Sequence, residues 1–376
     1  MARPIHFDTV RKEYRTAGTT HVAVDGLSLS IPEGSFTTLV GPSGCGKTTT
    51  LRMIAGLETP TDGQIAFGEE EVTDQSPQDR NCAMVFQSIA LYPHMSVRDN
   101  IGYGLKVQGV PKADRDDRID EAAETLQITE QLEKMPAELS GGQQQRVAPG
   151  SAFVQDPDVL LLDEPMSDLD AKLKSELRVE VQRLHQELDA TVVYVTHDQT
   201  EAMTMSDQVI LLNEGRLAQF APPGELFDAP VSKYVAEFIG TPSTNMLSAT
   251  VERTDEGLAL VGDGFEVTAP SDRFRDRVGE SVVLGIRPQY LSTDGGRYGL
   301  VVTAEVVEQL GTEFVVHGHG PDGTPIDAVS SAFGDVDPGD RLAVGFDAED
   351  LFVFGDDGRT ICHGDALAAD ARSQPR

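Results

Sequence analysis

Long apolar runs are missing from this 376-residue sequence. The best of them, VLLLD at 159–163, is far shorter than the ~18 residues that a membrane-crossing helix requires. The N-terminal stretch MARPIHFDTV lacks the apolar segment of a secretory signal, so we expect a cytoplasmic protein. Cysteine is also scarce: Cys45, Cys82 and Cys362 are odd in number and widely spaced, which fits reduced thiols and excludes a disulfide framework.

Basic residues are few. The sequence has 30 Lys and Arg against 62 Asp and Glu, a net charge of −32, and only eight of the basic residues are Lys. The acidic residues are spread along the whole chain, which is typical of proteins from an extreme halophile, where salt screens their mutual repulsion. An acidic protein from an ordinary cytoplasm is the alternative. Because such a charge reflects the solvent, it does not by itself argue against a nucleic-acid partner.

The local patterns divide the chain into two parts. Residues 1–240 alternate strand-like and helix-like stretches, among them FTTLVGPSGCGKTTTLRMIAGL, DVLLLDEP and ATVVYVTHD, which predicts an α/β domain with a mostly parallel sheet. The turn-rich stretch GTPSTN at 240–245 marks the boundary. Residues 241–376 contain short strand candidates such as VVLGIRP, FVVHG and RLAVGF, which predict a small all-β barrel or sandwich.

A phosphate loop lies early in the first part. The residues of GPSGCGKT satisfy G-x-x-x-x-G-K-[ST] at Gly41, Gly46, Lys47 and Thr48, between a strand and a helix. In such a loop the backbone N–H groups surround the phosphates, the lysine neutralises the β and γ oxygens, and the hydroxyl binds Mg²⁺. A chance glycine turn is the alternative, but the strand and helix on either side favour a nucleotide site.

Two later strands end in residues that suit phosphate chemistry. Asp163, the last residue of VLLLD, can hold Mg²⁺, and Glu164 beside it can orient or deprotonate water. An acidic pair after a buried strand is usually only a cap, but its place downstream of a phosphate loop favours the functional interpretation. His197 follows TVVYV and would lie near a γ-phosphate in the same sheet, although a lone histidine at a strand end is more often structural.

A second anion-binding pattern, LSGGQQQR, occupies 139–146, with Gly141 and Gly142 after Ser140 at the expected start of a helix. Two further candidates are weaker. HGH at 317–319 places two imidazoles on one strand face as a possible metal pair, with a solvated face as the alternative. Cys45 within the phosphate loop is interpreted as a small filler and not as a nucleophile.

Taken together, these residues resemble the ATP-binding subunits of ABC transporters. GPSGCGKT resembles the Walker A motif of that family, VLLLDE its Walker B, MVFQS its Q-loop, LSGGQ its signature, SDLD its D-loop and VTHD its H-switch, in the family's order. The resemblance covers residues 4 to about 240 and implies a P-loop ABC ATPase domain with a mixed sheet and a helical subdomain over 1–240. A small OB-like (TOBE-type) regulatory domain would follow over 241–376.

The resemblance also explains the second anion site. In this family two ATPase domains stack head to tail, so Ser140 and the glycines after it would cap a nucleotide held by Lys47 of the other subunit. The implied nucleotide contacts are Tyr14, Gly41, Pro42, Ser43, Gly44, Cys45, Gly46, Lys47, Thr48, Thr49, Gln87, Ser140, Gly141, Gly142, Gln143 and Asp168. The implied catalytic residues are Lys47, Glu164 and His197, and the implied Mg²⁺ ligands are Thr48, Gln87 and Asp163.

Finer similarity points to the importers of the MalK-like group, through QSIALYPHMSVRDNI, IGTPSTNML and LGIRPQYL. It implies a homodimer or a pair with a paralogous ATPase, on the cytoplasmic side of the membrane. The other partners would be two transmembrane permease subunits and, indirectly, a solute-binding protein, with no nucleic acid. A sugar or related solute is expected, while polyamines, iron, sulfate and molybdate stay open. A soluble ABC ATPase lacks support, and a phosphate-loop kinase would not explain LSGGQ.

One segment departs from the family pattern. Where the family usually reads RVALGRAL after the signature, this chain has RVAPGSAF, with Pro149, Ser151 and Phe153 as the differences. We expect a helix from about Gln143 towards Phe153, with Pro149 inside it. A proline there leaves the carbonyl of Gln145 without its donor, so the helix either bends while still presenting Ser140 or displaces the signature. We expect the bend.

Overall fold

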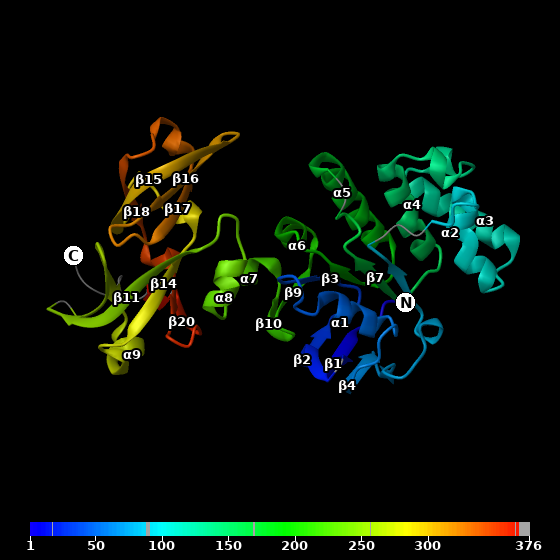
Figure 1. Ribbon diagram of the computed structural model, residues 1–376, viewed down its shortest axis with the longest axis horizontal. Coiled ribbons are helices and arrows are strands. Elements are labelled where there is room, and N and C mark those ends of the chain that lie inside the picture. The colour runs from blue at the N-terminus through cyan, green and yellow to red at the C-terminus, as the bar shows by residue number, and fades with distance from the viewer. Residues whose placement is uncertain (17, 88–90, 168–169, 256, 365, 368–376) are drawn as a thin grey trace. The chain divides into compact units, whose positions relative to one another are not determined.

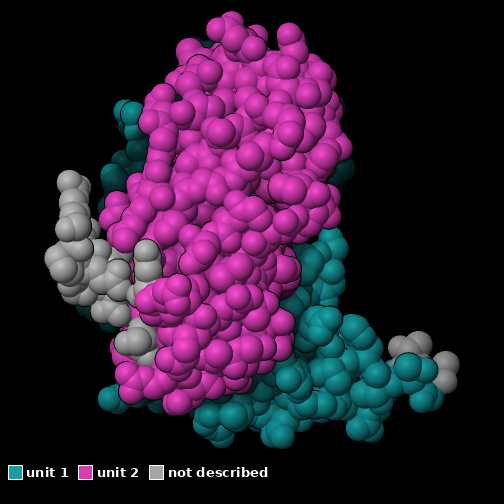
Figure 2. Space-filling model, turned by 90° about the vertical axis from the view of Figure 1, so that its left-hand side faces the viewer, with its two compact units in different colours: residues 1–223 teal, residues 224–376 magenta. Residues whose placement is uncertain are grey.

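A computed structural model gives the structure of the chain except for residues 17, 88–90, 168–169, 256, 365 and 368–376, which Figure 1 draws as a thin grey trace. The chain forms two units, Met1–Pro223 and Gly224–Arg376, shown in different colours in Figure 2. Within the described ranges, no helix has both the length and the apolar character needed to cross a bilayer.

The first unit is built around a six-stranded sheet in the order β10-β9-β3-β8-β7-β6. Its strands are β3 (Phe36–Val40), β6 (Cys82–Val85), β7 (Val159–Asp163), β8 (Thr191–Val195), β9 (Gln208–Asn213) and β10 (Arg216–Ala221). All neighbours are parallel except β9 and β10. Every residue of β3, β7 and β8 is buried, as expected of parallel strands with helices on both faces.

Alternate residues of these strands pack against different helices. Leu161 and Val193 share a core with Leu51 of α1 (Lys47–Ile54), whereas Leu160 and Val192 share a core with α5 (Ala171–Glu187). Side chains of a strand point alternately to its two faces, so α1 and α5 cover opposite faces of the sheet. The predicted α/β layering is confirmed.

Two further parts complete this unit. A four-stranded antiparallel sheet, in the order β2-β1-β4-β5, consists of β1 (Ile5–Thr16), β2 (Thr19–Ile31), β4 (Asp62–Phe67) and β5 (Glu70–Glu71). The helices α2 (Val97–Val107), α3 (Lys112–Thr125) and α4 (Gly141–Phe153) lie together (Figure 1) and share apolar side chains such as Ile101, Ile119 and Val147. They form the helical subdomain that the family resemblance implied, and α6 (Gln199–Met205) follows β8.

The second unit has two antiparallel sheets, β13-β12-β11-β14-β19-β20 and β17-β16-β15-β18. The strands are β11 (Asn245–Thr254), β12 (Gly257–Gly262), β13 (Phe265–Ala269), β14 (Ser281–Ile286), β15 (Tyr298–Leu310), β16 (Glu313–His319), β17 (Pro325–Ser330), β18 (Arg341–Phe346), β19 (Leu351–Phe354) and β20 (Thr360–His363). Residues of both sheets, including Leu284 and Val316, belong to one buried core. The prediction of a small β-rich fold is therefore confirmed, although α7 (Pro223–Asp228), α8 (Lys233–Phe238) and α9 (Ser271–Phe274) accompany the strands.

The division between the units lies between Pro223 and Gly224, whereas the sequence placed it near residue 240. The reason is Arg287, which follows β14 and is only 1% exposed. Its guanidinium donates hydrogen bonds to the carbonyl oxygens of Phe227 (2.9 Å), Ala236 (3.0 Å) and Ile239. A buried charged group needs such partners, so α7, α8 and their connection fold with the β-rich unit.

The HGH stretch lies on β16, and its histidines have separate partners. His317 Nδ1 lies 2.7 Å from an oxygen of Asp327, and His319 Nε2 lies 3.8 Å from one of Glu305. Among the described residues, no group of three or more His, Cys, Asp or Glu side chains could hold a metal ion. The two imidazoles are therefore each engaged by a carboxylate.

Pro149 lies inside α4, which runs from Gly141 to Phe153. Ser140 is the N-cap of this helix: its hydroxyl accepts a hydrogen bond from Gln143 N at 3.3 Å, and the Gln143 side chain accepts one from Ser140 N at 3.0 Å. Gly150 has almost no spare room, since a Cβ there would lie 3.1 Å from Leu126 and 3.2 Å from Ile101. The first turn thus keeps its cap despite the proline, while the bend at Pro149 stays a prediction.

The acidic surface leads to our first prediction, that folding requires salt. The Debye length falls from about 30 Å at 0.01 M salt to about 3 Å at 1 M, so a chain of net charge −32 repels itself most strongly in dilute buffer. The melting temperature should rise by about 10 °C or more between dilute buffer and 1 M KCl, if screening recovers several kcal/mol. Choline chloride at the same ionic strength should raise the melting temperature as much as KCl does. A melting temperature that does not change with salt concentration would contradict the prediction.

Candidate nucleotide-binding site

The site candidates meet at one edge of the six-stranded sheet. Because β3, β8 and β7 are adjacent and parallel, their carboxyl ends lie side by side. The loop of Gly41–Gly46 follows β3, His197 follows β8, and Asp163 with Glu164 ends β7. Ligands of open α/β sheets bind at this carboxyl edge, so the strand order alone assembles residues that are far apart in the sequence.

Two glycines of the phosphate loop are required by close packing. A Cβ on Gly41 would lie 2.3 Å from the carbonyl oxygen of Leu212, and one on Gly46 would lie 2.4 Å from that of Ala23. Both also have positive φ, 149° and 104°, which favours glycine. Gly46 is the N-cap of α1, so Lys47 and Thr48 begin that helix. The N-terminus of α1 therefore points its free N–H groups at the loop, as phosphate binding requires.

Lys47 is held against this loop. Its Nζ donates to the carbonyl oxygens of Gly41 at 2.8 Å and Pro42 at 3.1 Å, and the residue is only 7% exposed. Cys45 is buried behind it, and burial raises the pKa of its thiol, with Lys47 opposing the shift. A thiol with a raised pKa is a poor nucleophile, which supports the prediction that Cys45 only fills space.

Asp163 and Thr48 bring two side-chain oxygen atoms close together. The Thr48 hydroxyl lies 3.5 Å from Asp163 Oδ1, and Asp163 is 5% exposed. Burial, and then repulsion from Glu164, raise the pKa of Asp163. A buried carboxylate next to another carboxylate is stabilised by a cation, and hydroxyl and carboxylate oxygens are ligands that Mg²⁺ prefers.

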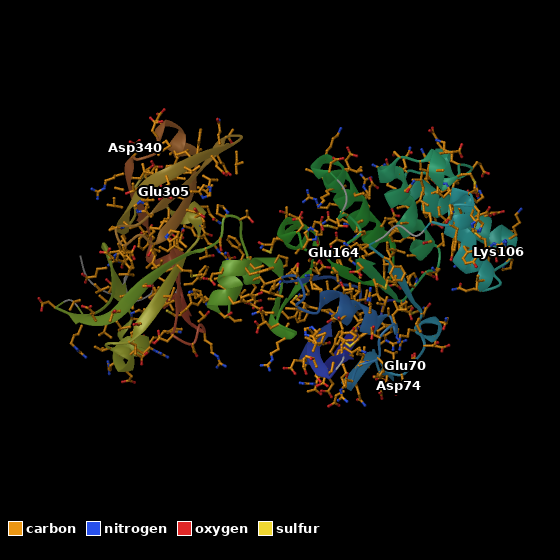
Figure 3. The ribbon with its side chains drawn as sticks, viewed as in Figure 1. Glu70, Asp74, Lys106, Glu164, Glu305 and Asp340 are labelled. Carbon is orange, nitrogen blue, oxygen red and sulfur yellow. The ribbon has the colours of Figure 1, made fainter. Side chains whose placement is uncertain are left out.

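Glu164, which is labelled in Figure 3, directly follows Asp163 and contacts two other predicted residues. Gln87 Nε2 donates to Glu164 Oε2 at 3.2 Å, and His197 Nδ1 lies 3.2 Å from the same oxygen. Glu164 has a φ of 46°, a conformation that is uncommon for a residue with a side chain. Its N–H donates to the carbonyl of Val195 at 3.0 Å, so the neighbouring strand β8 holds this backbone in place.

Lys47, Thr48, Glu164 and His197 line a cavity of about 390 Å³, whereas Gly41, Cys45, Gln87 and Asp163 are not among its described lining residues. Its lining comprises Tyr14, His21, Ala23, Ser43, Gly44, Gly46, Lys47, Thr48, Thr49, Glu164 and His197. Tyr14 lies on β1, and Lys12 Nζ lies 5.2 Å from the centre of its ring. The sequence did not identify His21, which pairs with Tyr14 across β1 and β2, or Ala23, two residues further along β2. No local pattern distinguishes these two from other strand residues.

The signature residues lie elsewhere in the described chain. Ser140, Gly141, Gly142 and Gln143 open α4 and are not among the described residues that line the cavity. Asp168 lies outside the described residues, while Asp170 caps α5 through a 3.0 Å bond from Leu173 N. Each chain therefore carries a phosphate loop and a separate helix N-terminus suited to anions.

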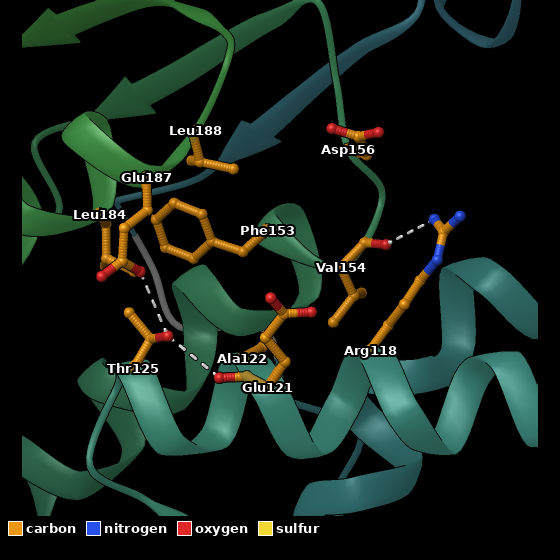
Figure 4. Close-up of a pocket in the computed structure, with 10 residues that line it drawn as sticks. All are labelled: Arg118, Glu121, Ala122, Thr125, Phe153, Val154, Asp156, Leu184, Glu187 and Leu188. Carbon is orange, nitrogen blue, oxygen red and sulfur yellow. Dashed lines mark hydrogen bonds between the residues drawn. The ribbon is translucent and has the colours of Figure 1, made fainter.

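A second hollow, of about 340 Å³, lies where α3, the end of α4 and the end of α5 meet (Figure 4). Its lining includes the buried side chains of Phe153 and Leu184. The charged residues Glu121, Glu187 and Arg118 also line it. Arg118 Nη1 donates to the Val154 carbonyl at 3.3 Å, and Thr125 lies 3.4 Å from Glu187. None of the predicted nucleotide residues lines this hollow, so the 390 Å³ cavity is the site candidate.

Comparison with known proteins agrees with this geometry. Residues 24–167 match the family described as ABC transporter, residues 240–291 the MalK OB fold domain, and residues 284–354 the TOBE domain. The chain is 45% identical over 361 residues to the sn-glycerol-3-phosphate import ATP-binding protein UgpC 1 of Rhizobium johnstonii, covering 95% of this chain and 96% of that one. It is 46% identical over 377 residues to the xylose/arabinose import ATP-binding protein XacK of Haloferax volcanii, covering 98% and 96%.

Solved structures agree as well. A bacterial ABC transporter cassette titled "Dimeric Structure of MJ0796" superposes with a TM-score of 0.53 at 29% identity, covering 58% of this chain and 98% of that one. A post-hydrolysis dimer of the same cassette, bound to ADP and Pi, matches at 28% identity with a TM-score of 0.53. With its phosphate loop, its acidic strand end and its β-rich second unit, the chain belongs to the ABC transporter family, among the MalK-like ATP-binding subunits of importers.

Proposed function

We propose that this subunit binds MgATP in the 390 Å³ cavity and hydrolyses it between two chains arranged head to tail. The observation that carries the proposal is the convergence of Lys47, Asp163, Glu164 and His197 at one sheet edge. Tyr14 would stack on the adenine, since an aromatic ring at the cavity wall suits a base. Lys47 and the loop N–H groups would bind the phosphates.

Mg²⁺ fits the pair of oxygens at Asp163 and Thr48, 3.5 Å apart. The ion would supply charge neutralisation at the β- and γ-phosphate oxygens. Gln87 is also proposed as a ligand; its amide is held by Glu164 Oε2, the oxygen that His197 also approaches. A small shift of Gln87 would therefore change the hydrogen bonding of Glu164 and, through the shared oxygen, its contact with His197.

Glu164 and His197 are proposed to act on the attacking water. Glu164 would accept the proton of this water or orient the water, and His197 would hold the Glu164 carboxylate through Oε2, which lies 3.2 Å from His197 Nδ1. In phosphoryl transfer, positioning and electrostatic stabilisation account for most of the rate. The uncommon backbone of Glu164, braced by Val195, suits a group whose direction matters.

The partners follow from the kinds of relatives. We propose that two such ATPase subunits, identical or paralogous, dock on two membrane permease subunits from the cytoplasmic side and work with a solute-binding protein. Because the names of the relatives specify sn-glycerol 3-phosphate and xylose or arabinose, a sugar or a related polyol phosphate is the proposed solute. The β-rich unit is proposed to be regulatory.

The head-to-tail arrangement is tested by mixing two inactive variants. Lys47→Ala removes the phosphate-binding lysine, and Ser140→Arg blocks the signature. A mixed dimer has one interface in which both halves are intact. Mixing should restore up to about one quarter of wild-type hydrolysis, because random pairing of a symmetric dimer makes half of the dimers mixed, each with one of two sites.

The matched control is a chain that carries both substitutions. Mixed with either single variant it offers no intact interface, so hydrolysis should stay at background. If crosslinking shows that mixed dimers form but no activity returns in the first mixture, the nucleotide is not shared between chains. Steady-state phosphate release is the measurement throughout.

A further inference from the structure

His197 is preceded by two residues, Tyr194 and Thr196, whose hydroxyls bond to one buried carboxylate. Glu201, in α6, is 2% exposed, and its Oε2 accepts hydrogen bonds from the hydroxyls of Tyr194 and Thr196, both at 2.6 Å. Bonds of this length from a hydroxyl to a carboxylate are among the strong ones. Tyr194 is itself fully buried in β8, so the carboxylate is anchored to the central sheet.

The hydroxyl of Thr196, the residue before His197, forms hydrogen bonds with two residues that come after His197. It donates to Glu201 and accepts a hydrogen bond from the N–H of Asp198 at 3.0 Å. The Asp198 carboxylate in turn accepts from Thr200 N at 2.8 Å and caps α6. The backbone on both sides of His197 is therefore held by one continuous set of hydrogen bonds, while its own side chain is exposed and reaches Glu164.

The hydrogen bonds among Tyr194, Thr196 and Glu201 depend on one another. Burial, and then the charge of Glu201, raise the pKa of Tyr194, so its hydroxyl keeps the proton that it donates. Removing one partner would leave a buried polar group without a bond, which costs more than the bond itself contributes. Thr196 has two such bonds, to Glu201 and from Asp198, so the turn at His197 is sensitive to the loss of its hydroxyl.

We propose that Thr196 and Glu201 are positioning residues for His197: through these hydrogen bonds they set the direction in which its imidazole meets Glu164. This inference rests on the proposed role of His197 in hydrolysis. It adds a function for two residues that are not themselves among the described residues lining the cavity. A misplacement of a catalytic group by about 1 Å can lower a rate by about 100-fold.

The test is the variant Thr196→Val, which keeps the branched shape of the side chain and removes the hydroxyl. The kcat of ATP hydrolysis should fall about 10-fold or more, while KM for ATP stays unchanged because Lys47 and Tyr14 are untouched. Thr196→Ser keeps the hydroxyl and should restore most of the rate. Thr73→Val is the matched control: Thr73 is also buried, and its hydroxyl bonds to Ile65, away from the site. It should lower the melting temperature without lowering kcat.

A double-mutant cycle with His197→Ala separates positioning from general damage. Single-turnover rates resolve the low activity of that background. If Thr196 acts through His197, Thr196→Val should change the His197→Ala rate by less than about two-fold. Glu201→Met, a second variant that removes the oxygen accepting both hydroxyls, should likewise change the His197→Ala rate by less than about two-fold. An equal loss in both backgrounds, or an unchanged kcat in Thr196→Val, would overturn the inference. An unchanged kcat in His197→Ala would instead overturn the proposed role of His197.

Discussion

Glu164→Gln is expected to lower ATP hydrolysis by about 100-fold or more, because a positioned acid or base contributes about 10²–10⁴-fold to a rate. The amide has the shape of the carboxylate and can still accept at one oxygen, so Gln87 and His197 keep a partner there. It cannot take a proton from water. ATP binding, which depends on Lys47 and its loop, should remain. Because the bound ATP is not hydrolysed, the closed dimer should persist.

The measurements are phosphate release and size-exclusion chromatography with MgATP. The variant should elute as a stable dimer when MgATP is present and as a monomer in its absence. Glu214→Gln is the matched control, since Glu214 is exposed and also has a positive φ, 48°, so the same change at a similar backbone should leave hydrolysis and elution unaltered. Undiminished hydrolysis in Glu164→Gln would remove Glu164 from its role.

Pro149→Leu is expected to stabilise the first unit by about 3 kcal/mol, the usual cost of proline inside a helix. Pro149 occupies α4 beyond its first turn, so it cannot donate to the carbonyl of Gln145, and its ring crowds that carbonyl. Restoring the N–H removes both costs. The melting temperature should rise by roughly 6–12 °C at about 2–4 °C per kcal/mol, while ATP affinity of the monomer stays unchanged.

Pro149 is buried, so Pro149→Ala is needed beside Pro149→Leu to separate the backbone gain from crowding by a larger side chain. Pro223→Ala is the matched control, because Pro223 begins α7, where proline is tolerated and no gain is expected. Gly150→Ala should raise the melting temperature little, since Leu126 and Ile101 crowd that position. Thermal melts and nucleotide titrations measure these effects. Equal melting temperatures for the wild-type protein and the two Pro149 variants would contradict the prediction.

Much of the first unit could be predicted from local patterns. The phosphate loop, the strand that ends at Asp163 and the strand before His197 were all recognised from short stretches, since a buried strand followed by glycine or acidic residues is a local signal. The wall of the cavity formed by His21 and Ala23 could not, because its place depends on the register of β1 and β2. The boundary near residue 240 was placed by turn residues alone, without the buried Arg287 that holds α7 and α8.

What the sequence determined by itself is the chemistry: which residue types follow which strands, where a helix must begin, and that two anion-binding patterns exist in one chain. The tertiary structure decided which of these residues meet. The order β3-β8-β7 brings Lys47, His197 and Glu164 to one edge. The buried Arg287 meets the carbonyl oxygens of Phe227 and Ala236, which lie 60 and 51 residues earlier in the chain. The physical reason is that strand order and buried polar networks depend on contacts between distant segments, whereas periodicity and turn chemistry act between neighbours.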